Sequence, residues 1–203
     1  MLNCFVVGIF LKKALPQKLQ LLFWLVLVTL IVEGIGTYYL NVLRRPAGLA
    51  YRLYQPVEYL LMAAYFFHII SFAKVRTVIL ASIPIIVITN IINILVESDN
   101  RLFGTYSFLT SAILLSVWSI IYFYQLIQEA EIRNPARNPD FWICTGILFF
   151  YAGTFFLMGC INYIYKNNTK LAQELYVINH LLNCILYGMI TYGFICQAKY
   201  QKS

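Results

Sequence analysis

The sequence predicts an all-α fold: a polytopic transmembrane helix bundle with six long spans and one short N-terminal helix, seven helices in total. Hydrophobic residues make up 61% of the 203 residues and charged residues only 11%, whereas soluble domains carry about 25% charged residues. The mean hydropathy is +0.74. No internal repeat or long linker divides the sequence, so residues 1–203 are expected to form a single transmembrane helical domain within the lipid bilayer.

Six apolar runs have the length of about 20 residues that a helix needs to cross a hydrocarbon core of about 30 Å. In chain order they are Leu19 to Leu40, Ala50 to Phe72, Thr77 to Val96, Phe103 to Ile127, Phe141 to Tyr163 and Leu171 to Cys196. A shorter run, Met1 to Leu11, reaches only about 16 Å at 1.5 Å per residue. It is expected to be a short first helix or the remainder of a longer one, and whether residues 1–15 cross the membrane stays open.

The segment RNPARNPDFW, residues 133–142, predicts the start of a helix. Asn138 suits the N-cap position and Pro139 the first helical position. The carboxylate of Asp140 favours the positive end of the helix dipole, and Trp142 suits the headgroup level of a bilayer. This interpretation is preferred over a docking motif for a partner.

The basic residues lie in the gaps between the apolar runs. The formal net charge of +7 arises from 15 basic and 8 acidic residues, and this distribution favours loops that obey the positive-inside rule over a nucleic-acid surface. If successive loops alternate sides, one side holds Lys12, Lys13, Lys18, Lys74, Arg76, Arg133, Arg137, Lys199 and Lys202, and the other holds Arg44, Arg45, Arg52, Arg101, Lys166 and Lys170. The larger set predicts a cytoplasmic C-terminus and an outside N-terminus in a cell (inner) membrane.

Two carboxylates lie inside apolar runs, where a charged side chain costs about 2.5–3.5 kcal/mol at the bilayer centre. Counted from the outer ends of their runs, Glu33 and Glu58 both lie about 12–14 Å deep at 1.5 Å per residue, so they are level. Other polar residues reach the same outer layer, namely Asn90, Asn93, Asn179, His180 and Asn183. The layer predicts a ligand-binding pocket that opens toward the outer side.

The alternative is that this polar layer only joins helices. Asn, Ser and Thr side chains in transmembrane helices often bond neighbouring helices, at about 0.6 kcal/mol per pair, and need no ligand. The 16 tyrosines and 15 phenylalanines are assigned to packing and interfacial belts. The five cysteines are expected to be reduced core residues.

The sequence contains no HExxH, G-x-S-x-G, P-loop or G-x-G-x-x-G motif. With only two histidines, His68 and His180, an intramembrane zinc hydrolase is not expected. We therefore expect no catalytic residues, no metal site and no cofactor, and we favour a protein that is not an enzyme.

The segments YQPVEYLLMAAYFF, residues 54–67, and NPDFWICTGILFFYAGTFFL, residues 138–157, resemble those of a group of small bacterial multi-pass membrane proteins, mostly uncharacterised. Members of that group have about seven predicted helices, so the resemblance implies the same bundle. It implies no established activity.

Three functional hypotheses follow from the polar layer. The first is a sensor or receptor-like protein, or a signalling accessory protein, that binds a small polar or amphipathic ligand and informs a cytoplasmic signalling partner. The second is an intramembrane lipid-modifying enzyme with Glu33 or Glu58 as general base, and the third is a small ion-coupled transporter. The first is preferred, because the sequence shows neither a nucleophile or metal set nor the internal repeat typical of transporters.

The charge distribution generates a test of sidedness. A cysteine introduced at Ser203 should be labelled by an impermeant thiol reagent only after the membrane is broken, because the C-terminus is expected in the cytoplasm. A cysteine at Ser98 should be labelled in intact cells. Labelling of the Ser203→Cys variant in intact cells would reverse the orientation.

Overall fold

The computed structural model describes residues 1–12, 15–45, 47–96, 105–128, 135–167 and 169–200. These residues form seven α-helices and one short 3-10 helix, with no strand among them. The α-helices are α1 (Leu2–Leu11), α2 (Gln17–Asn41), α3 (Gly48–Ile69), α4 (Ala73–Val96), α5 (Thr105–Gln128), α6 (Pro139–Asn167) and α7 (Thr169–Tyr200), and the 3-10 helix is η2 (Pro135–Arg137). The prediction of an all-α protein with seven helices is confirmed for these residues.

Five of the helices are long and apolar enough to cross a membrane, so the prediction of six such spans is wrong by one. The five segments are Gln17–Asn41, Ala73–Leu95, Tyr106–Gln128, Pro139–Gly159 and Val177–Lys199. Helix α3 has 22 residues but carries Arg52, Gln55 and Glu58, which lower its hydropathy. These polar residues are tolerated because α3 packs against α2, α4 and α5.

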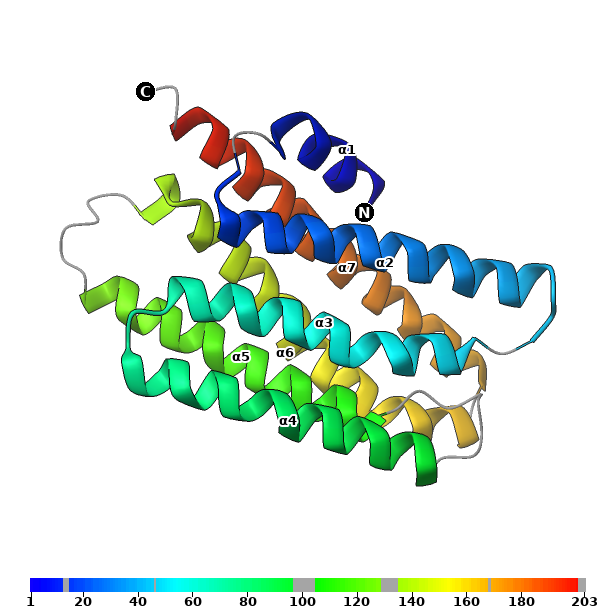
Figure 1. Ribbon diagram of the computed structural model, residues 1–203. Coiled ribbons are helices and arrows are strands. Elements are labelled where there is room, and N and C mark those ends of the chain that lie inside the picture. The colour runs from blue at the N-terminus through cyan, green and yellow to red at the C-terminus, as the bar shows by residue number, and fades with distance from the viewer. Residues whose placement is uncertain (13–14, 46, 97–104, 129–134, 168, 201–203) are drawn as a thin grey trace.

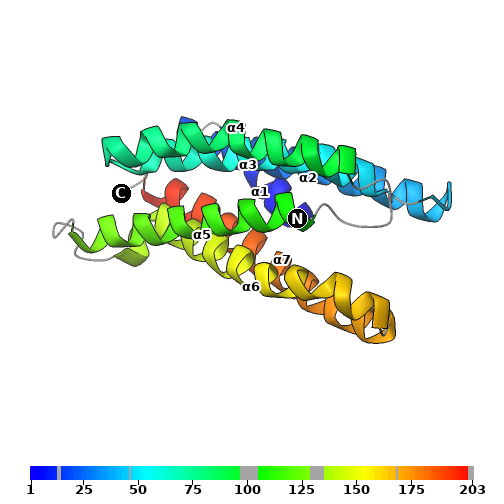
Figure 2. The ribbon, with the colours of Figure 1, turned by 90° about the horizontal axis from the view of Figure 1, so that it is seen from below.

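The helices converge at one end of the bundle and separate at the other. Helices α2, α3 and α4 lie side by side, and the pair α6–α7 diverges from them toward the end where α2 passes into α3 (Figures 1 and 2). We call this the splayed end, and we call the opposite end, where α2 and α6 begin, the closed end. Helix α1 lies against α2 and α7 near the closed end, with the Phe5 ring stacked 5.6 Å from that of Phe23.

An ion pair between the half-buried Lys18 and the buried Asp140, with Tyr65 on the same carboxylate, joins three helices at the closed end. Lys18 of α2 donates to Asp140 Oδ2 at the start of α6, and Tyr65 Oη of α3 donates to Asp140 Oδ1 over 3.0 Å. Asp140 is 5% exposed, so these donors replace water around its carboxylate. The ion pair and the tyrosine together hold α2, α3 and α6 in contact.

The predicted helix start at residue 139 is confirmed. Helix α6 begins at Pro139, and Asn138 Oδ1 accepts a hydrogen bond of 3.0 Å from the backbone N–H of Asp140. The indole N–H of Trp142 donates to the carbonyl oxygen of Ala136 over 2.8 Å, which fastens η2 to the helix. The N-cap therefore sets the position from which Asp140 reaches Lys18.

Glycines allow α6 and α7 to pack with their backbones close together. A Cβ atom on Gly146 would lie 2.7 Å from Cβ of Met189, and a Cβ atom on Gly193 would lie 2.6 Å from Cγ1 of Ile143. Such distances are shorter than van der Waals contact, so any larger residue would push the two helices apart. Gly188 of α7 has no such neighbour within 4 Å of its Cβ position.

Replacement of Gly146 by alanine should destabilise the protein by about 1–3 kcal/mol, because Cβ of Met189 is fixed to its backbone and cannot rotate away. Gly188→Ala is the matched control and should be neutral or slightly stabilising, because alanine favours a helix more than glycine does. Thermal unfolding of both variants in detergent checks this. Equal melting temperatures would contradict the close packing of α6 on α7.

Candidate functional site

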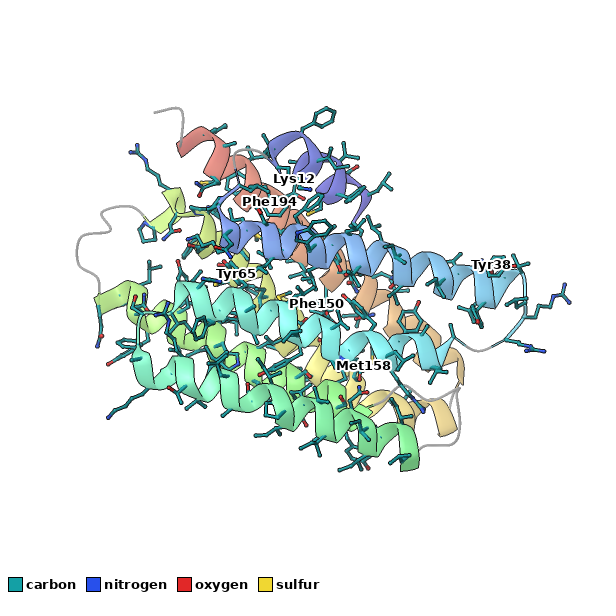
Figure 3. All side chains as sticks on the ribbon, in the orientation of Figure 1. Lys12, Tyr38, Tyr65, Phe150, Met158 and Phe194 are labelled. Carbon is teal, nitrogen blue, oxygen red and sulfur yellow. The ribbon has the colours of Figure 1, made fainter. Side chains whose placement is uncertain are left out.

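A cavity of about 130 Å³ lies between α2–α3 and α6–α7, in the half of the bundle nearer the splayed end. Figure 3 places Tyr65 toward the closed end, Phe150 near the middle and Met158 beyond it, and the last two line the cavity. The polar side chains of the lining are Thr29, Glu33, Gln55, Glu58, Asn179 and Asn183. Tyr51, Tyr54, Tyr187 and Phe108 complete it. Four of the seven predicted site residues therefore share one cavity.

Glu58 lines the cavity from α3 and is half-buried. Its Oε1 atom accepts a hydrogen bond of 2.7 Å from the hydroxyl of Tyr151, a residue of α6 that is only 1% exposed. A hydrogen bond to a carboxylate is stronger than one between neutral groups, and here it joins a residue of the cavity lining to a buried residue behind it. Glu58 thus connects α3 to α6.

Glu33 lines the cavity from α2, and its Oε2 atom accepts a hydrogen bond of 3.2 Å from the hydroxyl of Tyr51 in α3. Gly36 makes this contact possible. A Cβ atom at that position would lie 2.9 Å from Cζ of Tyr51, so only glycine lets the tyrosine ring rest on α2. The segment EGIG, residues 33–36, therefore supplies both the acid and the space for its partner.

Two further polar pairs line the cavity. The hydroxyl of Thr29 donates to the carbonyl oxygen of Leu25 over 2.8 Å, so in its contact of 2.5 Å with Tyr54 Oη the tyrosine is the donor. Asn183 Nδ2 donates to the backbone oxygen of Asn179 over 2.9 Å. The side chain of Asn179 is 9% exposed and makes no hydrogen bond within the described part of the chain.

The other three predicted site residues lie elsewhere. Asn90 Nδ2 of α4 lies 3.0 Å from the backbone oxygen of Arg52, 3.2 Å from Gln55 Oε1 and 3.2 Å from Ser107 Oγ. Its two hydrogens are shared among these three acceptors, so Asn90 joins α3, α4 and α5. Asn93 is also buried in α4 and does not line the cavity. These two side chains belong to the opposite side of α3, because α4 packs on the face of α3 that is turned away from α7.

His180 is exposed and does not line the cavity. Asn179 and Asn183 are four residues apart and therefore lie on the same face of α7. Successive residues of a helix point about 100° apart, so His180, which follows Asn179, lies on a different face. The structure therefore places this predicted site residue outside the cavity.

Sequence reasoning missed the tyrosines that hold the two acids. Tyr151 lies in an almost continuous apolar run, where nothing marks it as the partner of an acid 93 residues earlier. Tyr51 and Tyr54 share a helical stripe with Glu58, which the spacing in the sequence shows, but the stripe does not pair Tyr51 with Glu33 of another helix. They were assigned to packing because of the general richness in aromatic residues.

The described residues contain no group of three or more His, Cys, Asp or Glu side chains that is placed to bind one metal ion. The cavity offers two carboxylates and two asparagine side chains, on three different helices. The cavity can therefore interact with a molecule through hydrogen bonds, through charge and through aromatic rings.

A cysteine at Asn183 should react with the small reagent 2-aminoethyl methanethiosulfonate, because this side chain borders open space. In a background with the five native cysteines replaced by alanine, it should react about tenfold or more faster than a cysteine at Ser119, which is 0% exposed. Mass spectrometry of samples quenched at successive times gives the rates. Equal rates would show that the cavity is closed to small molecules.

No protein-family model, no curated protein and no solved structure matches this chain. The resemblance to small bacterial multi-pass proteins accordingly gains no support and stays a prediction. What the chain shows is the architecture of a membrane-embedded helical bundle with a polar cavity.

Proposed function

We propose that this protein is a sensor or receptor-like membrane protein whose cavity binds a small polar or amphipathic ligand. The observation that carries the proposal is the meeting of Glu33, Glu58, Asn179 and Asn183, from α2, α3 and α7, around one cavity. Placing two carboxylates in an apolar bundle costs free energy. Their position beside the same cavity supports a role in binding a ligand.

Polar groups that serve only to join helices are arranged differently in this protein. Tyr59 Oη lies 2.6 Å from Ser82 Oγ, and Trp118 Nε1 donates to the same tyrosine over 3.4 Å, in a part of the bundle where all three side chains are buried. Such groups satisfy one another, and the space beside Tyr59 is only about 10 Å³. The side chains around the cavity instead leave polar atoms turned toward a volume that a small molecule can occupy.

The position of the cavity suits a protein that converts binding into helix movement. It separates α2–α3 from α6–α7, while the Lys18 and Asp140 ion pair joins the same helices at the closed end. A ligand that contacts both sides shifts the equilibrium between two helix arrangements by as much as its binding free energy differs between them. With the orientation predicted from the basic residues, the ligand enters from outside and the closed end meets a cytoplasmic signalling partner.

The alternatives receive less support. Within the described part of the chain, the only side-chain hydrogen bonds of Glu33 and Glu58 come from Tyr51 and Tyr151. A lipid-modifying enzyme that uses covalent catalysis would need an activated nucleophilic side chain beside one of these acids. An ion-coupled transporter would be favoured by an internal repeat, which the sequence does not show.

A panel of small amines, alcohols, amides and carboxylic acids tests the proposal on the protein in lipid nanodiscs. Compounds of about six to eight non-hydrogen atoms fit, since an engineered cavity of about 150 Å³ accepts benzene. At about ten times its dissociation constant, a ligand should raise the free energy of unfolding by about 1.4 kcal/mol, a shift of a few degrees in Tm.

Asn183→Leu should abolish this shift, because it removes the amide and keeps a similar volume. His180→Leu is the matched control on the same helix and should retain the shift, because His180 lies outside the cavity. If no compound stabilises the wild-type protein, and Glu33→Gln and Glu58→Gln leave its stability and cellular phenotype unchanged, the polar layer only joins helices.

A further inference from the structure

We infer that the ligand of this cavity is a small organic amine in its ammonium form, bound between the carboxylates of Glu33 and Glu58. The inference rests on the proposed function and specifies its ligand. It depends on three properties of the lining: its charge, its unused hydrogen-bond acceptors and its aromatic wall.

Among the described residues, the lining carries two acidic side chains and no Lys, Arg or His. Arg52, the buried basic residue of α3, is not part of it. A carboxylate removed from water is costly unless a positive charge or several donors face it, and Glu33 and Glu58 each receive one tyrosine hydroxyl. A cation in the cavity supplies the missing countercharge for both acids at once.

The hydrogen bonds of the lining leave acceptors unused. Tyr51 and Tyr151 occupy one oxygen of Glu33 and one of Glu58, so the second carboxylate oxygen of each acid is available. Asn183 uses its Nδ2 atom on the backbone of Asn179, which leaves its Oδ1 atom. A ligand that donates several hydrogen bonds fits this set, and a primary ammonium group donates three.

Asn179 provides a second, independent indication of a ligand. Its side chain is 9% exposed, lines the cavity, and makes no hydrogen bond within the described part of the chain. A buried amide without a partner costs about 1–3 kcal/mol. A bound molecule that hydrogen-bonds this amide removes that cost.

The size and the walls of the cavity favour an organic cation over a metal ion. The rings of Tyr54, Tyr187, Phe108 and Phe150 line it, and aromatic faces attract ammonium groups. Calcium prefers six to eight oxygen ligands, and the described residues contain no group of three or more His, Cys, Asp or Glu side chains that could hold a metal ion. A volume of about 130 Å³ suits a ring-sized molecule.

Three probes with one ring and different polar groups test the charge of the ligand: benzylamine, benzyl alcohol and benzoate. Their binding to the wild-type protein in nanodiscs of uncharged phospholipid is measured at neutral pH, where benzylamine is positively charged, with protein-free nanodiscs as the blank. Benzylamine should bind about tenfold or more tightly than benzyl alcohol, and benzoate more weakly than either.

Glu33→Gln and Glu58→Gln should each weaken benzylamine binding about tenfold or more and leave benzyl alcohol binding within about threefold. Glutamine keeps an oxygen that can accept from Tyr51 or Tyr151, so these variants preserve the hydrogen bonds of the bundle. Glu33 gives the second test if the Glu58 variant fails to fold. His180→Gln, outside the cavity, should leave all three affinities unchanged.

Equal or tighter binding of benzyl alcohol or benzoate, lost in Asn183→Leu, would overturn the ammonium inference and leave the proposed binding function standing. Displacement of benzylamine by calcium at concentrations at which tetramethylammonium has no effect would also overturn it, in favour of a metal ion. If none of the three probes binds the wild-type protein, the inference is wrong, and the wider panel then decides whether the cavity binds any ligand.

Discussion

The arrangement of this bundle depends on the ion pair between Lys18 and Asp140 at the closed end. It draws together the first turn of α2 and the first turn of α6, and Tyr65 adds α3 to the same carboxylate. With Asp140 5% exposed, loss of Lys18 would leave the carboxylate charge in buried surroundings, which costs more than the pair itself contributes. Gln125 adds α5, since its Oε1 atom accepts from the backbone N–H of Ser71 over 2.8 Å and its Nε2 atom donates to Ser71 Oγ over 3.0 Å. Because the helices are fixed at this end, they can separate at the other without loss of the fold.

The bundle treats its buried polar groups in two ways. Between α3, α4 and α5, amide and hydroxyl groups such as those of Asn90, Ser107 and Ser82 bond to neighbouring helices within packed surroundings. Between α2–α3 and α6–α7, carboxylates and amides line a volume. In the first arrangement most groups bond to neighbouring helices, whereas in the second part of the hydrogen-bonding capacity faces the cavity. Gln55 touches both, because it lines the cavity and also accepts from Asn90. A change in the cavity can therefore reach α4 through a single amide.

The sequence predicted some of these features and not others, for physical reasons. Apolar length predicts helices directly, and Asn138 with Pro139 fixes a helix start through local chemistry alone, so both could be read from the chain. The depth of Glu33 and Glu58 follows from counting residues at a constant rise. The depth of a residue does not tell how its helix is rotated about its axis. For this reason Asn90 and His180 were assigned to the polar layer by depth, although their side chains do not point into the cavity. The predicted number of apolar spans was wrong at α3. This helix is too polar to count as a span, and its packing against neighbouring helices compensates for its polar composition. The contact of Tyr151 with Glu58 is purely tertiary and leaves no trace in spacing.

The glycine contacts of α6 with α7 have a mechanical consequence. Gly146 and Gly193 bring the two helices so close that neither can slide or turn past the other, so they form one stiff arm. Helix α7 has 32 residues and a length of about 48 Å. A rotation of this arm by about 5° about the closed end moves its far tip by about 4 Å over that length, while side chains beside the pivot move by only a fraction of that distance. The width of the cavity can thus change through a small hinge angle, with the contacts that define the fold left almost undisturbed.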